Sequence, residues 1–390
     1  MKERIGLATV HTGYNYGTSL QALATKRYIE NMGYQLDILG YKSSFIKGRD
    51  IRIKKILIMG LRMLQNPFLI KKTFLLHKKN LTKKIESETK ILFDNFTQRK
   101  LQIKKMSYLE MKKYSRDKKT LALLCGSDQI WNGATLYVDP FYYLRFAPLE
   151  KRIAFSPSFG REKIEKYNEN IIKKYLSEIK YLSTRENAGQ KIIKKLVNKK
   201  AEVLIDPTLL LSSKEWLSEL DKEEIINDKF IILYFLDFPC DKTLEKIKDI
   251  IKNRKEKIIV LPQMNENFFQ LNKEFVEYSV GPLEFIDLIN KSTLVLTDSF
   301  HGMLFSINFN KEFYVFERNY GVASNQSSRI ESILNILNLK ERYQKKDTKL
   351  EKKDINWSIV NDILEKERKK TKIYLQKSLK NIKDCNNEKK

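Results

Sequence analysis

The 390-residue chain has few cysteines, and they lie far apart. Cys125, Cys240 and Cys385 are the only three, and they form no CxxC pair. Such spacing provides neither a disulfide framework nor a cysteine-based zinc site, so we expect no metal centre. Isolated cysteines are typical of the reducing cytoplasm, which is where we expect this protein.

Long hydrophobic runs are also missing. The longest uncharged stretch, Ile5 to Thr25, contains His, Asn, Gln and Tyr, whereas a membrane span needs about 20 predominantly apolar residues. The chain opens on a strand-like segment in place of a basic and then apolar signal segment. We therefore expect no transmembrane helix.

Acidic residues are scarce relative to basic ones. The chain has 74 Lys and Arg against 48 Asp and Glu, a formal charge of +26, and lysine outnumbers arginine by 58 to 16. Basic charge favours non-specific contact with polyanions, but a lysine-rich composition is also what codon bias produces. No zinc-finger or aromatic RNA-binding signature accompanies the charge, so no specific nucleic acid is expected. The few arginines are more informative, because a planar guanidinium matches carboxylate and phosphate groups.

Short β-branched segments alternate with helical patterns, which predicts an α/β fold with helices covering parallel sheets. We expect a domain over residues 1–216, a linker over 217–229 and a second domain over 230–338. A basic helical insertion at about 42–118 and a basic helical tail over 339–390 complete the chain. Two such domains imply a cleft between them, where small ligands preferentially bind.

Part of the insertion, residues 51–80, combines eight cations with many apolar residues and has no acid. A basic amphipathic helical pair of this kind is able to lie on an anionic membrane, which is a candidate partner. Attachment there would place the protein on the inner face of the plasma membrane. The competing interpretation is a helical insertion packed on the main domain with extended lysines at its surface.

A TDSFHG motif ends at Gly302, between a β-branched strand and an apolar helix. His301 would lie at the carboxyl end of a parallel strand, near a helix N-terminus that favours anions. Its ordinary pKa near 6.5 suits proton transfer at neutral pH. Asp298 or Ser299 is suited to cap the helix, which is also the structural interpretation of both.

Arg185, in a STREN motif, also follows a predicted strand and precedes a helix. This position fits a bound carboxylate or phosphate, but an internal ion pair with Glu186 or Asp206 fits equally well. Further cations, Lys311, Arg318 and Arg329, follow the histidine motif. Lys311 is interpreted as a loop lysine.

The GSDQIWN motif, at Gly126 to Asn132, follows another predicted strand. Its glycine permits close approach of the backbone to a ligand. Asp128 and Gln129 are suited to sugar hydroxyls and Trp131 to an apolar sugar face. Capping of a helix explains Ser127 and Asp128 equally well.

Six motifs in order carry a family resemblance: NYGTSLQA from Asn15, GSDQIWN, STREN, DPTLLL from Asp206, GPLEFIDLI from Gly281 and TDSFHGMLFSINFNKEF. Over about the first 335 residues the chain resembles the polysaccharide pyruvyl transferase family. The resemblance implies two Rossmann-like domains in a GT-B-like arrangement. It also implies transfer of the enolpyruvyl group of phosphoenolpyruvate onto two hydroxyls of a sugar as a ketal. The alternative is a GT-B-like glycosyltransferase that uses a nucleotide sugar.

By motif position, the family's essential histidine falls on His301 and its phosphoenolpyruvate-binding arginine on Arg185. We expect no cofactor, since phosphoenolpyruvate is a substrate, and the acceptor is a sugar or a lipid-linked oligosaccharide. The candidate donor-binding residues are Arg185, Arg318, Arg329, Ser299 and Gly302. The candidate acceptor-binding residues are Asn15, Tyr16, Asp128, Gln129 and Trp131.

Overall fold

The computed structural model describes residues 2–11, 13–42, 51–66, 70, 87–220, 228–261, 276–277, 279–318, 327–350 and 353–387. Residues 71–80 of the expected basic helical pair lie outside this part of the chain. So do residues 221–227 of the expected linker and the polar loop at 321–326 that precedes Arg329.

Five parallel strands form the N-terminal sheet, in the order β3-β2-β1-β4-β5. They are β1 Arg4–Ala8, β2 Gln35–Tyr41, β3 Lys104–Met106, β4 Thr120–Cys125 and β5 Arg152–Ala154. A two-stranded parallel sheet, β6 Ser183–Thr184 and β7 Glu202–Val203, adjoins β5 through a bridge between Ile153 and Tyr181. Every residue of β4 is buried, as expected of a parallel strand covered on both faces. The helices of this domain are α1 Tyr16–Asn31, α5 Tyr108–Arg116, α6 Lys166–Ser177, α7 Asn187–Val197 and α8 Ser213–Leu217.

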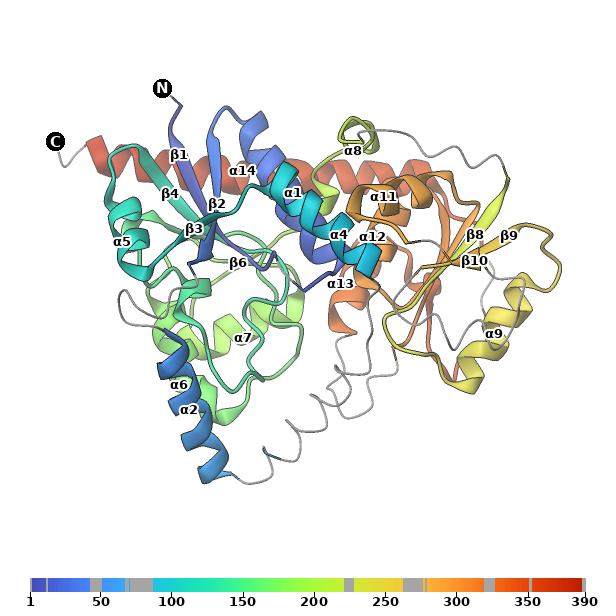
Figure 1. Cartoon of the computed structure of the whole chain (residues 1–390), viewed down its shortest axis with the longest axis horizontal. Coiled ribbons are helices and arrows are strands. Elements are labelled where there is room, and N and C mark those ends of the chain that lie inside the picture. The colour runs from blue at the N-terminus through green and yellow to red at the C-terminus, as the bar shows by residue number, and fades with distance from the viewer. Residues whose placement is uncertain are drawn as a thin grey trace.

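Six parallel strands form the C-terminal sheet, in the order β10-β9-β8-β11-β12-β13. They are β8 Phe230–Tyr234, β9 Lys257–Val260, β10 Val276–Glu277, β11 Leu294–Thr297, β12 Glu312–Phe316 and β13 Tyr343–Gln344. Its helices are α9 Asp241–Ile251, α11 Pro282–Lys291, α12 Phe300–Asn308 and α13 Ser328–Ile336. Figure 1 shows the two domains side by side, the N-terminal one in blue to green and the C-terminal one in yellow to red. The predicted α/β fold with two Rossmann-like domains in a GT-B-like arrangement is confirmed.

The expected helical tail over residues 339–390 is helical only in part. It first forms a short 3₁₀ helix, Lys340–Arg342, and then adds β13 to the C-terminal sheet beside β12. The long helix α14, Trp357–Asn387, follows and runs behind both domains (Figure 1). The Tyr374 hydroxyl donates to the Ala154 carbonyl at 2.8 Å, and Lys383 pairs with Glu3 at 2.6 Å. The tail therefore returns to the N-terminal domain and links the two.

The expected insertion at about 42–118 is also more than a peripheral addition. Helix α2, Ile51–Gln65, lies at the edge of the molecule, but β3 is a strand of the N-terminal sheet and α5 leads back to β4. Helix α4, Ser87–Phe96, brings the buried Phe93 against Tyr16, with ring centroids 5.0 Å apart. The sequence did not indicate this because a short edge strand carries little hydrophobic signal.

Tyr16 lies where the two domains meet. Its ring stacks on Phe285 of α11 with centroids 4.5 Å apart, and its hydroxyl donates to the Val280 carbonyl at 2.9 Å. Tyr16 is 1% exposed. One buried apolar cluster runs from β1 and α1 to α11, α12 and α14, so both domains share a hydrophobic core.

Replacing Tyr16 with phenylalanine keeps the stacking but removes the donor to Val280. A buried carbonyl left without a partner costs about 1–3 kcal/mol, so we expect urea unfolding to show a loss of that size. Tyr41→Phe is the control, because the Tyr41 hydroxyl bonds Asp139 at 3.0 Å at the surface, where water replaces it. Equal losses in the two variants would contradict the interdomain role of the Tyr16 hydroxyl.

Candidate active site

The NYGTSLQA, GSDQIWN and TDSFHG motifs follow strands at the points where the strand order of the two large sheets reverses. In the N-terminal sheet this point lies between β1 and β4, and in the C-terminal sheet between β8 and β11. Gly17 follows β1, Asp128 follows β4, Asp237 follows β8 and His301 follows β11. Crevices at such positions are the usual ligand sites of parallel sheets. Chain topology thus brings these residues towards a common region.

Arg185, Asp206 and His301 form the buried centre of this region. The Arg185 guanidinium donates through Nη1 to Asp206 Oδ2, and His301 Nε2 lies 3.7 Å from that same oxygen. Arg185 is 5% exposed, Asp206 1% and His301 6%. Of the two partners that the sequence left open for Arg185, Asp206 is the one in contact; Glu186 instead accepts from the backbone N–H groups of Phe159 and Gly160.

Asp128 extends this charged group. Its Oδ1 lies 3.6 Å from Arg185 Nη2, and its Oδ2 accepts from the Thr18 hydroxyl at 2.8 Å. Burial acts to raise the pKa of Asp128, but Arg185, His301 and Arg329 together hold it below its ordinary value. Burial opposes ionisation of Asp206 too, yet Arg185 and His301 lower its pKa. In this centre Arg185 lies between two carboxylates, and His301 lies beside one of them.

Several donors at this centre have no hydrogen-bond partner within the described part of the chain. They are Nε and Nη2 of Arg185 and Nε2 of His301. Buried donors are normally paired with protein or water. An anionic ligand is the chemistry that would satisfy the two Arg185 donors, and His301 Nε2 as well when that nitrogen carries a proton.

Arg329 and Arg318 occupy different places. Arg185 and Arg329 both contact the ring of Phe300, at 4.6 Å and 5.1 Å from its centroid. Arg318 instead pairs with Asp237 and lies 3.9 Å from Asp298 Oδ2. Burial is the main cause that raises the pKa of Asp298 to about 6, although Arg318 opposes it. The structure thus brings Arg329 to the buried centre and keeps Arg318 at a neighbouring carboxylate pair.

Ser299 and Gly302 shape the start of α12. This helix begins at Phe300, so His301 lies in its first turn, whereas the sequence placed the whole TDSFHG motif ahead of the helix. The Ser299 hydroxyl accepts from the Gly302 N–H at 3.3 Å, which is the capping interpretation. A Cβ on Gly302 would lie 2.8 Å from Thr297 Oγ1, so glycine is needed for close packing.

Two of the predicted acceptor-binding residues are buried in packed cores. Tyr16 packs between the two domains. Trp131 is 1% exposed, its ring stacks on Tyr143, and its Nε1 donates to the Tyr142 carbonyl at 3.0 Å. Both side chains therefore serve packing in this structure, and their contact with a sugar stays a prediction. Asn15 caps α1 by accepting from the Thr18 N–H at 3.1 Å. Gln129 is half-buried, next to Asp128.

Gly17 packs directly against His301, a contact that the sequence did not indicate. A Cβ on Gly17 would come within 1.9 Å of His301 Nδ1, so the start of α1 is packed directly against the imidazole. Gly17 is not among the site residues that the sequence predicted. The order NYG next to a strand end was the available signal, but its partner lies nearly 300 residues away.

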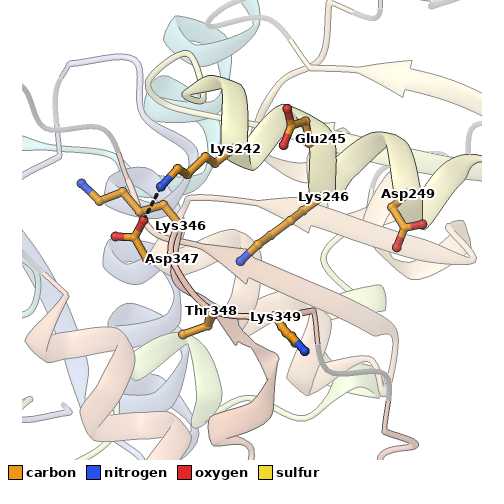
Figure 2. A pocket seen from close by; sticks show the side chains of 8 residues that line it. All are labelled: Lys242, Glu245, Lys246, Asp249, Lys346, Asp347, Thr348 and Lys349. Carbon is orange, nitrogen blue, oxygen red and sulfur yellow. Dashed lines mark hydrogen bonds and ion pairs between the residues drawn. The ribbon is translucent and has the colours of Figure 1, made fainter.

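A surface hollow of about 480 Å³ lies elsewhere, on the C-terminal domain. Figure 2 shows its lining from α9 and from residues 346–349, with Lys242 Nζ 2.7 Å from Asp347 Oδ1. None of the predicted site residues lines it. Across the described ranges, no group of three or more His, Cys, Asp or Glu is placed to hold a metal ion, and no helix is long and apolar enough to cross a membrane.

Two parallel-sheet domains with ionisable side chains gathered between them define a GT-B-like α/β protein. A family model described as polysaccharide pyruvyl transferase matches residues 15–320. The chain belongs to this family, which confirms the resemblance carried by its ordered motifs. None of the curated proteins matches the chain.

Solved structures with a similar fold include UDP-N-acetylglucosamine 2-epimerases. The Neisseria meningitidis enzyme bound to UDP-GlcNAc is 12% identical with a TM-score of 0.46, covering 97% of this chain and 100% of that one. A further similar structure, the S. aureus MnaA–UDP co-structure, is 10% identical with a TM-score of 0.48, covering 94% of this chain and 88% of that one. The putative Listeria monocytogenes enzyme is 10% identical with a TM-score of 0.45, covering 93% and 95%.

Gly17→Ala tests the packing against His301. The added methyl group overlaps the imidazole, and such overpacking costs about 1–3 kcal/mol, which urea unfolding measures. Gly60→Ala on α2 is the control, because a Cβ there meets nothing within 4 Å and alanine is favoured in helices by up to about 1 kcal/mol. Stabilisation by both substitutions would contradict the close contact.

Asp206→Asn removes the charge that neutralises Arg185. Breaking a buried pair costs about 3–5 kcal/mol, measured at pH 7 as the difference in the free energy of unfolding between wild type and variant. Because folding lowers the pKa of Asp206, its stabilisation is present above the unfolded-state pKa and is lost as the pH falls.

The difference between wild type and Asp206→Asn should therefore narrow below about pH 4, by up to roughly 1.4 kcal/mol per pH unit. Asp117→Asn is the control, since Asp117 is an exposed carboxylate whose pKa is lowered by the Lys119 N–H and by Arg4. Its stability should stay close to that of the wild type. A difference for Asp206→Asn that stays constant down to pH 3 would contradict the assignment.

Proposed function

We propose that this protein transfers the enolpyruvyl group of phosphoenolpyruvate to two hydroxyls of a sugar, forming a pyruvate ketal. The acceptor is a sugar of a cell-surface polysaccharide or of its lipid-linked precursor. The family supports a pyruvyl transferase and a polysaccharide acceptor. The observation that carries the choice of donor is the buried group of Arg185, Arg329 and His301 beside the first turn of α12.

Phosphoenolpyruvate has a carboxylate and a phosphate, and both need cationic donors. A guanidinium fork suits either group, and the N-terminus of a helix adds favourable N–H dipoles. Arg185 offers Nε and Nη2 to one of these two anionic groups. Arg329, from its position over Phe300, is placed to bind the other. Because Arg185 and His301 are almost fully buried, binding of the donor requires neighbouring side chains to move.

The reaction needs a proton on the methylene carbon of the donor. Protonation there makes C2 electrophilic, so one sugar hydroxyl adds to it and releases its own proton. Departure of phosphate then lets the second hydroxyl attack the same carbon and release its proton, which completes the ketal. Cationic groups at the departing phosphate stabilise its charge in the transition state.

His301 is the group proposed to deliver and remove these protons, since imidazole titrates near neutral pH. The Asp206 carboxylate lies 3.7 Å from Nε2, so it is positioned to orient the ring. Packing of Gly17 against Nδ1 fixes the ring orientation. Asp128, bonded to Thr18 beside Arg185, is positioned to accept from a sugar hydroxyl.

The test measures phosphate release from phosphoenolpyruvate with a candidate acceptor, together with thermal shifts on adding phosphoenolpyruvate or nucleotide sugars. We expect His301→Ala to lower the rate at least about 100-fold, the order of a lost general acid, while circular dichroism still reports a folded protein. Undiminished turnover in that variant would remove His301 from the mechanism. A thermal shift with nucleotide sugars alone would instead favour a glycosyltransferase.

Arg318→Gln and Arg329→Gln form a matched pair for the donor site. Loss of Arg329 should weaken the phosphoenolpyruvate-induced thermal shift, because this arginine shares the Phe300 ring with Arg185. Loss of Arg318 should leave the shift largely intact, since this arginine pairs with Asp237. The opposite ranking would move the donor site towards Asp237 and Asp298.

A further inference from the structure

Helix α2 exposes large apolar side chains instead of burying them. Ile56 is 69% exposed, Leu57 61%, Leu61 59% and Leu64 79%. Leu57, Leu61 and Leu64 are four and three residues apart, so they form one stripe along the helix. Isolated exposed leucines are common in proteins, but a continuous stripe on one helix marks an interaction surface.

The opposite side of α2 is attached to the N-terminal domain. Arg62 donates through Nη1 to Asn168 Oδ1 at 2.7 Å, and its guanidinium lies over the Tyr167 ring, 5.1 Å from the centroid. Ile58, Met59 and Met63 are half-buried on this side. Helix α2 lies at the edge of the molecule, next to α6 (Figure 1). Its leucine stripe is on the side away from these contacts and is exposed.

The charge of this region limits what covers the stripe. Apart from Arg62, which is held by Asn168, the ionisable residues of α2 are Arg52, Lys54 and Lys55, all cationic, and residues 41–110 as a whole have a net charge of +13. A second copy of this chain placed stripe to stripe would bring these cations together. An anionic lipid surface, by contrast, satisfies the leucines with its hydrocarbon boundary and the cations with its headgroups.

We propose that α2 docks the protein on an anionic lipid bilayer, with Leu57, Leu61 and Leu64 inserted at the headgroup boundary. Interfacial helices combine a strongly cationic polar side with an apolar side that enters about 5–10 Å into the membrane. The docking stands apart from the transfer chemistry. A bilayer at α2 would also hold a lipid-linked acceptor close to the N-terminal domain.

The test is sedimentation of the full-length protein with vesicles of phosphatidylglycerol and phosphatidylcholine, and with vesicles of phosphatidylcholine alone. The variant L57Q/L61Q/L64Q removes the stripe without touching a buried residue. The matched control L109Q/L149Q/I373Q changes three leucine or isoleucine side chains that are 64%, 51% and 63% exposed on other elements. Equal thermal unfolding midpoints verify that all three proteins are folded.

We expect wild type and control to bind the anionic vesicles alike and the stripe variant to bind at least roughly tenfold more weakly, since burial of three leucines is lost. Binding to neutral vesicles should be weaker, and added salt should reduce binding to the anionic ones. The proposal is overturned if the wild type does not bind anionic vesicles or if the stripe variant binds them as well as the wild type. It is also overturned if the control variant loses as much vesicle binding as the stripe variant. Concentration-dependent dimers that need the stripe, without vesicle binding, would assign the surface to a second copy.

Discussion

A guanidinium group that is almost shielded from water must be neutralised by carboxylates, and this requirement organises the centre of the molecule. Arg185 meets it with Asp206 in direct contact and Asp128 nearby. The carboxylates follow different strands of the N-terminal domain, while His301, which shares Asp206, comes from the C-terminal domain. Removing one carboxylate would leave a buried charge uncompensated. The pairing therefore ties the positions of several loops to one another.

The relative position of the two domains is fixed by packing around this charged centre. Tyr16 is stacked against α11, Gly17 lies against His301, and α14 spans from one domain to the other. Arg368 of α14 strengthens the junction, donating to the Leu209 carbonyl at 2.7 Å and to Asn308 at 3.0 Å. Because the imidazole has so little space, its orientation depends on how the domains meet. Chemistry and domain packing therefore cannot be varied independently.

Motif order was the most reliable guide to the site. His301 and Arg185 each follow a strand and precede a helix, which sequence patterns show well, and both lie in the buried centre. Tyr16 and Trp131 were predicted to bind the acceptor because an aromatic residue in a turn-rich motif looks available to a ligand. Both rings instead fill space between packed elements. The sequence pattern cannot distinguish these outcomes, since burial depends on elements far away in the chain.

By itself the sequence determined the alternation of strands and helices, the family and the cationic, amphipathic character of residues 51–65. These properties are local, because hydrophobic periodicity and motif order are present in the chain before it folds. Only the tertiary structure decided that Asp206 rather than Glu186 pairs with Arg185, that Arg329 joins Arg185 at Phe300, and that α2 turns its leucines outward. Each of these depends on which segments, far apart in the sequence, meet in space.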